Sequence, residues 1–428
     1  MKTASNKVIN GWAMYDWANS VYNLVITTTF FPIYFLAVTN GENGHVSFMG
    51  MRFVNSALYN YTMAVAFLLV ALASPILSSI ADTRGNKKNF LRFFTILGAL
   101  SCSALYLFDG DHLTIGVLGF MLATMGYCGG LVFYNSYLPE IATPEDRDSV
   151  SAKGYGMGYI GSVILQLIGF AIVLYGKKQG WDESLPVKIT FLLVGIWWLG
   201  FAQITFASLP KSTATVTKHN SSVLTEGFTE LRKVYAQVRV LPVLKRFLRG
   251  FFFYSMGVQT VMMAATIFGS KVLHLEATQL IVTVVVIQIV AIAGAWIMAK
   301  LSGKYGNLRV LIGVVFLWIG VCIAGYKMQT AFHFYMLATA VGLVMGGIQS
   351  LSRSTYAKLM PETTDTTSFF SYYDVTEKLS IVIGMFSFAY IDDLTNDMRN
   401  SVLALIVFFV IGLIWIISAL LKQKQLAK

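Results

Sequence analysis

The chain has 428 residues, of which 56% are hydrophobic and 12% are charged. Ordinary soluble domains are about 45–50% apolar and about 25% charged, so this composition excludes a water-soluble globular protein. The formal net charge is +11. In a protein this apolar, such an excess belongs to loops that face the cytoplasm, and we expect no nucleic-acid partner.

Apolar runs bounded by Gly, Pro, Asn and charged residues predict twelve membrane-spanning helices, each close to the length of about 20 residues that a bilayer requires. The first run holds Asp16 and Pro32 and is about twice as long as the apolar region of a signal peptide, so it is the first span. The predicted spans are residues 12–38, 56–80, 90–108, 113–138, 154–175, 187–209, 247–272, 278–299, 308–326, 331–352, 369–391 and 401–421.

Lysine and arginine are distributed unequally between the two sides that these spans define. An even number of spans places both termini on one side, and that side carries 24 Lys and Arg residues against 7 on the other. Positive residues are retained in the cytoplasm. We therefore expect an integral protein of a bacterial inner membrane with both termini in the cytoplasm.

The longest connection, residues 210–246, divides the spans into two groups of six. Its Leu224, Phe228, Leu231, Tyr235, Val238 and Leu241 recur at helical spacing, which predicts an amphipathic helix on the cytoplasmic surface. The expected organisation is an N-terminal six-helix bundle over 1–209, this linker, and a C-terminal six-helix bundle over 247–428.

The two halves share loop sequences. Gly85-Asn86 follows the second span as Gly306-Asn307 follows the eighth, and Pro139-Glu140 follows the fourth as Pro361-Glu362 follows the tenth, at nearly the same separation along the chain. A parallel repeat of six plus six spans is typical of secondary transporters, which bind substrate between the halves near the bilayer midplane.

The loop after the second span resembles the signature loop of the major facilitator superfamily. Asp82, Gly85, Lys87 and Lys88 fit the pattern, whereas Ser78 replaces a glycine and Thr83 replaces a basic residue. The resemblance implies that Asp82 and Lys87 act in conformational gating and do not bind substrate.

Several segments are similar to the autophagy-related vacuole-effluxer-like branch of this superfamily. These are WAMYDWANS at 12–20, FPIYF at 31–35, YSMGVQT at 254–260, GGIQSLSRS at 346–354 and YYDVTEK at 372–378. The resemblance implies the major facilitator fold, an all-α membrane protein of twelve transmembrane helices in two six-helix bundles with pseudo-two-fold symmetry. It also implies a transporter, and fungal members of the branch export amino acids from vacuoles.

Ionisable side chains inside a span cost about 2.5–3.5 kcal/mol on insertion scales, so we give them a functional interpretation by default. In the first span Asp16, Asn19, Asn23 and Thr27 follow helical spacing and predict one polar face that lines a cavity between the halves. The alternative is that Asp16 lies near the interface and only caps neighbouring helix ends.

The eleventh span carries three more charges. Asp374 and Lys378 have the spacing of an intrahelical ion pair, which would neutralise itself. Glu377 lies about 100° away around the helix and has no obvious local partner. We therefore predict Asp16 and Glu377 as proton-coupling residues. Arg353 is either a cross-helix partner for Glu377 or a cytoplasmic anchor.

Tyrosines, amides and hydroxyl groups share faces of other spans and suit a small polar organic solute. Each tyrosine taken alone also fits an interface belt or helix packing. The predicted substrate-binding residues are Asn19, Asn23, Tyr127, Tyr134, Tyr159, Gln166, Tyr254, Gln259 and Gln349. The predicted gating or ion-pair residues are Asp82, Lys87, Glu140, Arg353, Glu362, Asp374 and Lys378.

The sequence carries no phosphate-binding loop, zinc-protease motif or serine-nucleophile motif, its histidines form no ligand cluster, and its three cysteines lie in apolar runs. We expect no cofactor, no metal and no enzymatic activity. The predicted function is a monomeric, proton-coupled secondary transporter of a small polar or zwitterionic, amino-acid-like solute. The alternatives are a lipid or cell-wall-fragment translocator of the same fold and a non-transporting membrane receptor.

Overall fold

A computed structural model describes residues 2–39, 44–210, 223–395 and 397–427. Long helices occur at every predicted span, and their bounds lie within seven residues of the expected ones. The helices of the first half are α1 (Asn6–Val21), η1 (Tyr22–Phe30), α2 (Phe31–Val38), α3 (Asn55–Arg84), α4 (Lys87–Ala104), η3 (Leu105–Leu107), α5 (Leu113–Asn135), α6 (Leu138–Ile141), α7 (Arg147–Gln179) and α8 (Ser184–Ser208). Those that follow are α9 (Val223–Val240), α10 (Pro242–Leu273), α11 (Ala277–Tyr305), α12 (Asn307–Lys327), α13 (Ala331–Leu359), α14 (Thr366–Thr395) and α15 (Met398–Leu426).

Within the described ranges, 11 helical segments are long and apolar enough to cross a membrane. The first of them, Asn6–Val38, joins α1, η1 and α2 into one span. Helix α14 is not among the 11, because its charged residues interrupt the apolar stretch in the middle and again near its end. Its 30 residues are nevertheless sufficient for a span, since about 20 are needed.

The contacts between residues divide the chain into two compact units. The N-terminal unit comprises Ser5–Asn135 and Met157–Val223, and the C-terminal unit comprises Met1–Ala4, Ser136–Gly156 and Leu224–Lys428. Helix α7 contributes its first part to the C-terminal unit and the remainder to the N-terminal unit. The segment between α5 and the middle of α7 therefore packs with helices that come from the other half of the sequence.

The repeated Gly-Asn loops have the same backbone role in each unit. Gly85 ends α3 with a φ of 63°, and Gly306 separates α11 from α12 with a φ of 87°. Both values lie in the region that glycine adopts at low cost, so each glycine stops one helix and allows the next to begin within two residues. The equivalent chain reversals explain why these loop sequences resemble each other.

A β-hairpin lies between α2 and α3, where the sequence suggested only a loop. Strands β1 (His45–Phe48) and β2 (Met51–Val54) pair antiparallel with His45 opposite Val54. Met49 and Gly50 form the turn with φ values of 50° and 78°. Positive φ at both central residues is the geometry that two-residue hairpins favour, because its twist matches that of the strands.

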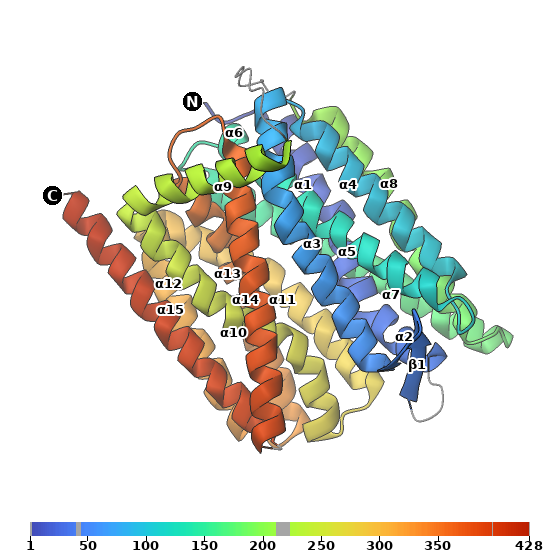
Figure 1. Ribbon diagram of the computed structural model, residues 1–428. Helices are drawn as coiled ribbons and strands as arrows, with labels where there is room; N and C mark the ends of the chain where they lie inside the picture. Colours follow the sequence, from blue (N-terminus) through green and yellow to red (C-terminus); the bar gives the residue numbers. More distant parts are fainter. Residues whose placement is uncertain (1, 40–43, 211–222, 396, 428) are drawn as a thin grey trace. The chain divides into compact units, whose positions relative to one another are not determined.

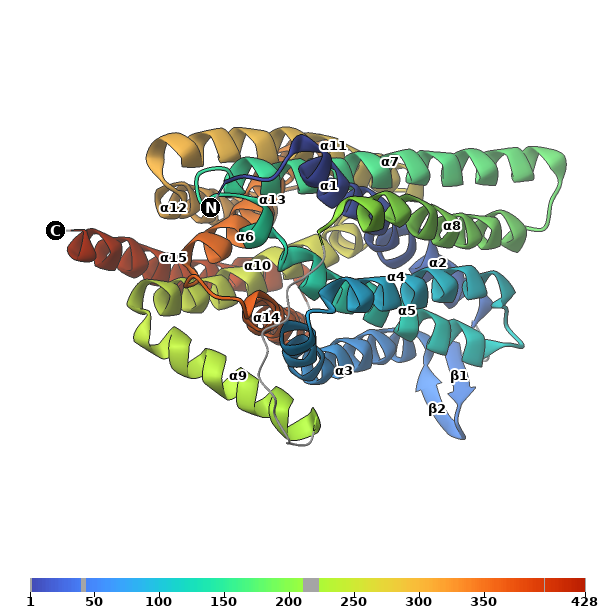
Figure 2. The ribbon, with the colours of Figure 1, turned by 90° about the horizontal axis from the view of Figure 1, so that it is seen from above.

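The linker contains helix α9, whose C-terminal part is buried at Val234 and Val238. Lys233 Nζ lies 2.9 Å from Asp365 Oδ2, just before α14. Figure 2 shows α9 extending at an angle from the start of α10. Residues 211–222 of the expected linker lie outside the described residues.

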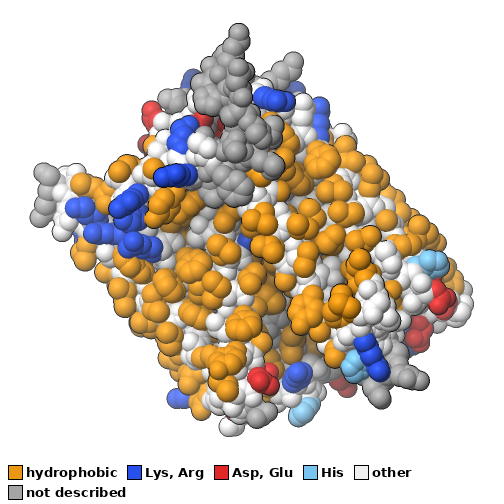
Figure 3. Space-filling model, in the orientation of Figure 1, with side chains coloured by type: hydrophobic (Ala, Val, Ile, Leu, Met, Phe, Trp, Pro, Cys, Tyr) orange, Lys and Arg blue, Asp and Glu red, His pale blue; other side chains and the backbone are white. Residues whose placement is uncertain are grey.

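Large apolar side chains cover the outer faces of the spans. In the C-terminal unit Phe386 on α14 and Ile414 on α15 are exposed, and in the N-terminal unit Leu68 and Leu72 on α3 are exposed. Figure 3 shows hydrophobic side chains over the positions that α3, α14 and α15 occupy in Figure 1, with Lys and Arg gathered near the C-terminal end of α15. Such apolar surfaces are the ones that hydrocarbon solvates.

Candidate functional site

Asp16 of α1 is buried in the N-terminal unit, with 4% of the residue exposed. Tyr134 of α5 donates a hydrogen bond of 2.8 Å from Oη to Asp16 Oδ2. The Tyr134 ring stacks on Trp12 with centroids 4.5 Å apart, and Trp12 Nε1 donates to the Tyr134 carbonyl oxygen over 3.0 Å. The structure thus brings two predicted site residues, Asp16 and Tyr134, into direct contact inside the helix bundle.

Two buried amide side chains in the same unit have unused hydrogen-bonding capacity. Gln166 Nε2 of α7 donates to Thr29 Oγ1 over 3.0 Å, but Gln166 Oε1 has no partner among the described residues. Asn19 is fully buried, and its Nδ2 likewise lacks a described partner. Because buried polar groups are nearly always hydrogen-bonded, unpaired atoms of this kind are suited to contact a bound solute or water.

The single polar face expected along the first span is interrupted at Tyr22. From Tyr22 to Phe30 the chain forms a π-helix, in which the Thr28 hydroxyl donates to the Asn23 carbonyl five residues earlier. The wider turn breaks the α-helical spacing that the expectation assumed. Asn23 is exposed, whereas Asn19 is buried. The expectation of one continuous stripe through Asp16, Asn19, Asn23 and Thr27 is therefore corrected.

The remaining tyrosines predicted in this region pack among aromatic rings and helices. Tyr127 of α5 is half-buried, with its ring 5.2 Å from that of Tyr22 and 6.5 Å from that of Trp198. Tyr159 of α7 is buried. The roles of Tyr127 and Tyr159 in substrate binding stay predictions.

Three charged residues of α14 form the second group of predicted site residues, and we call Asp374, Glu377 and Lys378 the α14 cluster. Lys378 Nζ lies 3.2 Å from Asp374 Oδ1, which is the expected intrahelical pair. Lys378 Nζ also lies 3.5 Å from Glu377 Oε2. Gln259 Nε2 of α10 donates to Glu377 Oε1 over 3.4 Å. Glu377, which was expected to lack a local partner, therefore contacts Lys378 on its own helix and Gln259 on α10.

The α14 cluster has an unequal number of opposite charges, because two carboxylates share one ammonium group. The side chains of Lys378 and Asp374 are 6% and 7% exposed, and that of Glu377 is 24% exposed. Asp374 Oδ2 is buried without a partner among the described residues. With all three groups ionised, one negative charge remains in a region where low polarity makes an uncompensated charge costly.

Two further predicted residues of the C-terminal unit lie on α10 and α13. The Tyr254 and Ser352 hydroxyl groups are hydrogen-bonded over 2.7 Å, and both residues are buried. Gln349 is half-buried, and its Nε2 lies 3.6 Å from the Met262 sulfur. Tyr254 thus packs α10 against α13 inside the C-terminal unit.

Arg353 of α13 is buried and lies against the first part of α7. Its Nε donates to Ser151 Oγ over 3.0 Å, its Nη2 donates to the Ser151 carbonyl oxygen over 2.8 Å, and its Cζ lies 4.2 Å from the centre of the Tyr155 ring. A guanidinium group held by two hydrogen bonds and an aromatic face is fixed in position. These contacts join α13 to the first part of α7, and the two roles considered for Arg353 stay predictions.

The other predicted gating residues divide between the two units. In the C-terminal unit Glu140 Oε1 accepts a hydrogen bond of 2.7 Å from Thr366 Oγ1 at the start of α14, whereas Glu362 is exposed. In the N-terminal unit Asp82 and Lys87 are buried at the ends of α3 and α4.

Similar proteins identify the family to which this chain belongs. The family described as "Vacuole effluxer Atg22 like" matches residues 4–426. An MFS-type transporter of Bacillus subtilis strain 168, named YxiO, is 33% identical over 413 residues and covers 95% of this chain and 93% of its own. The chain belongs to the Atg22-like family of the major facilitator superfamily. Autophagy-related protein 22 of Eremothecium gossypii is 27% identical over 476 residues, which cover 99% of this chain and 92% of that protein.

Solved transporters have the same fold. The human organic anion transporter MFSD10 has a TM-score of 0.77 over 96% of this chain and 99% of its own, at 10% identity. The Escherichia coli fucose:proton symporter FucP has a TM-score of 0.70 over 96% and 97%, at 12% identity. The expected major facilitator fold is confirmed. The protein is an integral membrane transporter of a small-molecule substrate and not an enzyme.

In this transporter a cluster that we did not predict connects the ends of four helices, α7, α11, α12 and α13. We call Asp148, Ser302, Asn307 and Lys358 the Asp148 cluster. Asp148 Oδ2 lies 2.6 Å from Lys358 Nζ and accepts a bond of 2.7 Å from Ser302 Oγ, while its Oδ1 accepts 2.7 Å from Asn307 Nδ2. Lys358 Nζ donates to Asn307 Oδ1 over 3.0 Å. The only signal in the sequence was Asn307, which lies in the repeated Gly-Asn loop.

Proposed function

We propose that this protein is a proton-coupled secondary transporter of a small zwitterionic solute that resembles an amino acid. The observation that carries the proposal is the α14 cluster, in which a buried and a half-buried carboxylate share one lysine and one oxygen of the buried carboxylate has no described partner. Such a group of charges inside a membrane helix is costly unless it has a function.

The excess charge of the α14 cluster supports proton coupling. Addition of one proton to Glu377 or Asp374 makes the cluster neutral, and loss of that proton restores the negative charge. The protonated and unprotonated forms of the carrier therefore differ by one charge inside the membrane. This difference in charge can couple the conformation of the carrier to the proton gradient. Asp16, held by Tyr134, is a second site at which a proton can be exchanged. Two solved transporters with this fold, the fucose:proton symporter FucP and the proton:xylose symporter XylE, are described as proton symporters.

The chemistry of the polar groups supports a zwitterionic substrate. Lys378 offers an ammonium group for a carboxylate, and Glu377 offers a carboxylate for an ammonium group. Asn19, Gln166 and Gln259 add amide groups, which can donate and accept hydrogen bonds. The polar atoms without described partners on Asn19 and Gln166 are the strongest candidates for contact with the solute.

Gating is assigned to the segment that joins α5 to α7. Residues 136–156 bind helices from the second half of the sequence. The contacts are those of Asp148 with Lys358, Ser151 with Arg353 and Glu140 with Thr366. Alternating access in this fold proceeds by rocking of the two halves, so these bonds form and break in each cycle. We place the protein as a monomer in the inner membrane of a bacterial cell. This segment and both termini then lie in the cytoplasm.

A stability screen identifies the substrate class. The purified protein is heated in detergent at two pH values with amino acids, dipeptides, nucleosides and sugars, because a ligand that binds only the folded state raises the Tm. We expect a rise with a subset of amino acids or dipeptides that depends on pH. A rise confined to lipids or cell-wall fragments would replace the proposal with a translocator of those molecules, and no rise with any compound would favour a receptor.

A further inference from the structure

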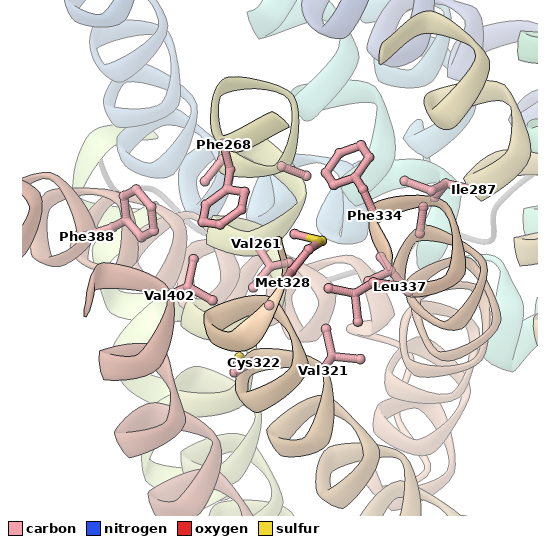
Figure 4. Close-up of a pocket in the computed structure, with 15 residues that line it drawn as sticks. Val261, Phe268, Ile287, Val321, Cys322, Met328, Phe334, Leu337, Phe388 and Val402 are labelled. Carbon is pink, nitrogen blue, oxygen red and sulfur yellow. The ribbon is translucent and has the colours of Figure 1, made fainter. Parts of the chain in front are cut away.

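The C-terminal unit contains a partly open apolar cavity of about 60 Å³ that the proposed transport function does not use. All six long helices of this unit, α10 to α15, contribute to its wall, and every lining residue is apolar. Figure 4 shows Met328, Phe268 and Phe334 around the space, with Phe388 and Val402 to one side. Apolar cavities remain dry and accept hydrocarbon guests, so the occupant that fits is a hydrocarbon chain.

The cavity lies toward one end of the helices of this unit. Met328 is in the connection between α12 and α13, and Phe334 lies in the first turn of α13. Phe268 and Val402 are close to the end of α10 and the start of α15. The Asp148 cluster lies at the opposite ends of α11 and α13, since Ser302 and Lys358 are near their C-terminal ends.

A guanidinium group lies at the rim of this cavity. Arg399 Nη1 donates to the carbonyl oxygens of Tyr326 over 2.8 Å and Met328 over 2.5 Å, and Arg399 Cζ lies 5.7 Å from the centre of the Phe268 ring. Two of these contacts, Met328 and Phe268, are cavity residues. Among the described residues Arg399 Nε and Nη2 have no acceptor, and a guanidinium can bind a phosphate through two adjacent nitrogens.

We infer that this cavity and Arg399 form a binding site for a phospholipid of the surrounding bilayer. The phosphodiester group is bound by Arg399 at the interface, and the end of one acyl chain occupies the cavity. Asp397 Oδ1 accepts the Arg399 backbone N–H over 2.9 Å and so places a carboxylate beside the headgroup. That carboxylate repels the negative phosphodiester, so neutralising it strengthens binding of the phospholipid.

Photo-crosslinking tests the inference. The protein is reconstituted in vesicles of phosphatidylethanolamine and phosphatidylglycerol with a trace of phosphatidylglycerol that carries a diazirine at the end of one acyl chain. A diacylglycerol with the same modified chain is the matched probe without phosphate. We expect the phospholipid probe to label the peptide that contains Met328 and Phe334 more strongly than the diacylglycerol probe does.

Variants separate the headgroup from the cavity. Arg399→Gln should lower cavity labelling by the phospholipid about tenfold, the size expected for one charge-assisted hydrogen bond, and leave labelling by the diacylglycerol unchanged. Arg246→Gln is the matched control, because Arg246 Nη1 also donates to a backbone carbonyl, that of Ser418 over 3.0 Å, but lies roughly 30 Å along α10 from Phe268. Asp397→Asn should increase labelling by the phosphatidylglycerol probe.

A second variant keeps the test valid if Arg399→Gln does not fold. A Cβ on Gly325 would lie 3.3 Å from Val402 Cγ1 and 3.6 Å from Leu337 Cδ2, so Gly325→Ala narrows the cavity and should lower labelling by both probes. Labelling confined to exposed residues such as Phe316 and Phe386, or equal labelling of the cavity by the two probes, would overturn the inference.

Discussion

Lys358 Nζ lies 2.6 Å from Asp148 Oδ2, which joins the last turn of α13 to the first turn of α7. The two residues are 210 positions apart in the sequence. The side chain of Asp148 is 4% exposed and that of Lys358 is 22% exposed, so water screens the pair only in part. Asn307 bonds both members, which fixes their geometry.

Loss of the Asp148 charge should destabilise the protein. Asp148→Asn leaves Lys358 without its counter-charge in a mostly buried position, and we expect a decrease in the free energy of unfolding of about 2–3 kcal/mol. Denaturant unfolding in detergent measures it. Asp365→Asn is the control, because its partner Lys233 is 48% exposed and surface pairs contribute about 0–1 kcal/mol. Equal effects of the two substitutions would contradict the structural role of Asp148.

Exchange of the charges of Asp148 and Lys358 tests whether this pair takes part in gating. Asp148→Lys and Lys358→Asp each place like charges together and should lower the transport rate at least about tenfold, because each blocks formation of the pair. The double variant re-forms the pair and should recover most of the rate. Transport by the double variant that is no better than by either single variant would show that the pair does not take part in gating.

Asn19 should affect substrate affinity more than folding. Its Nδ2 has no described protein partner, so Asn19→Leu removes a group available to the solute, and we expect the KM to rise about tenfold with a small change in the Tm. Thr95→Val is the matched control in the same unit, because Thr95 Oγ1 is bonded to Tyr15 Oη over 3.1 Å. That variant should lower the Tm and leave the KM unchanged. The reverse pattern would remove Asn19 from the substrate site.

Close packing of α4 on α5 depends on glycine. A Cβ on Gly126 would overlap the backbone of Gly98, so Gly126→Ala forces the two helices apart and should cost about 1–3 kcal/mol in unfolding free energy. Gly313 of α12 has open space around its Cβ position, and Gly313→Ala should stabilise by about 0.5–1 kcal/mol because alanine favours helix. Thermal unfolding of both variants checks the opposite signs.

Carboxylates in the loops outside the membrane should not contribute to the pH dependence of transport. The hydrogen bond from His112 lowers the pKa of Asp109, and the hydrogen bond from Ser184 lowers the pKa of Asp182. Stability due to a lowered pKa is present at neutral pH and is lost only as pH falls through the folded-state pKa, below the ordinary value of about 3.9. Asp109→Asn and Asp182→Asn should therefore leave the uptake profile between pH 5 and pH 8 unchanged.

The sequence predicted the spans because each depends on a continuous apolar run, which is a local property. It predicted the pair of Asp374 with Lys378 for the same reason, since the spacing lies within one helix. The π-helix at Tyr22–Phe30 was missed, because a change from four-residue to five-residue hydrogen bonds leaves the apolar pattern intact. The partner of Arg353 required contact between segments 202 positions apart, which no local pattern specifies.

Asp148 is a residue of the candidate site that the sequence likewise did not predict, because its contacts join distant segments. In the sequence it lies among other charged residues between two predicted spans, and nothing in its neighbourhood distinguishes it from Asp146 or Glu145. Its importance comes from Ser302, Asn307 and Lys358, which the fold of the C-terminal unit brings to one point. Only the repeated Gly-Asn loop marked one of these partners in advance.

Uptake into proteoliposomes under an imposed pH gradient tests proton coupling at the α14 cluster most directly. The assay uses the solute from the stability screen and compares the wild-type protein with Glu377→Gln and Asp16→Asn. We predict that the wild type accumulates solute against its gradient and that Glu377→Gln loses this accumulation but still exchanges solute across the membrane. Unchanged gradient-driven uptake in both variants would contradict the account.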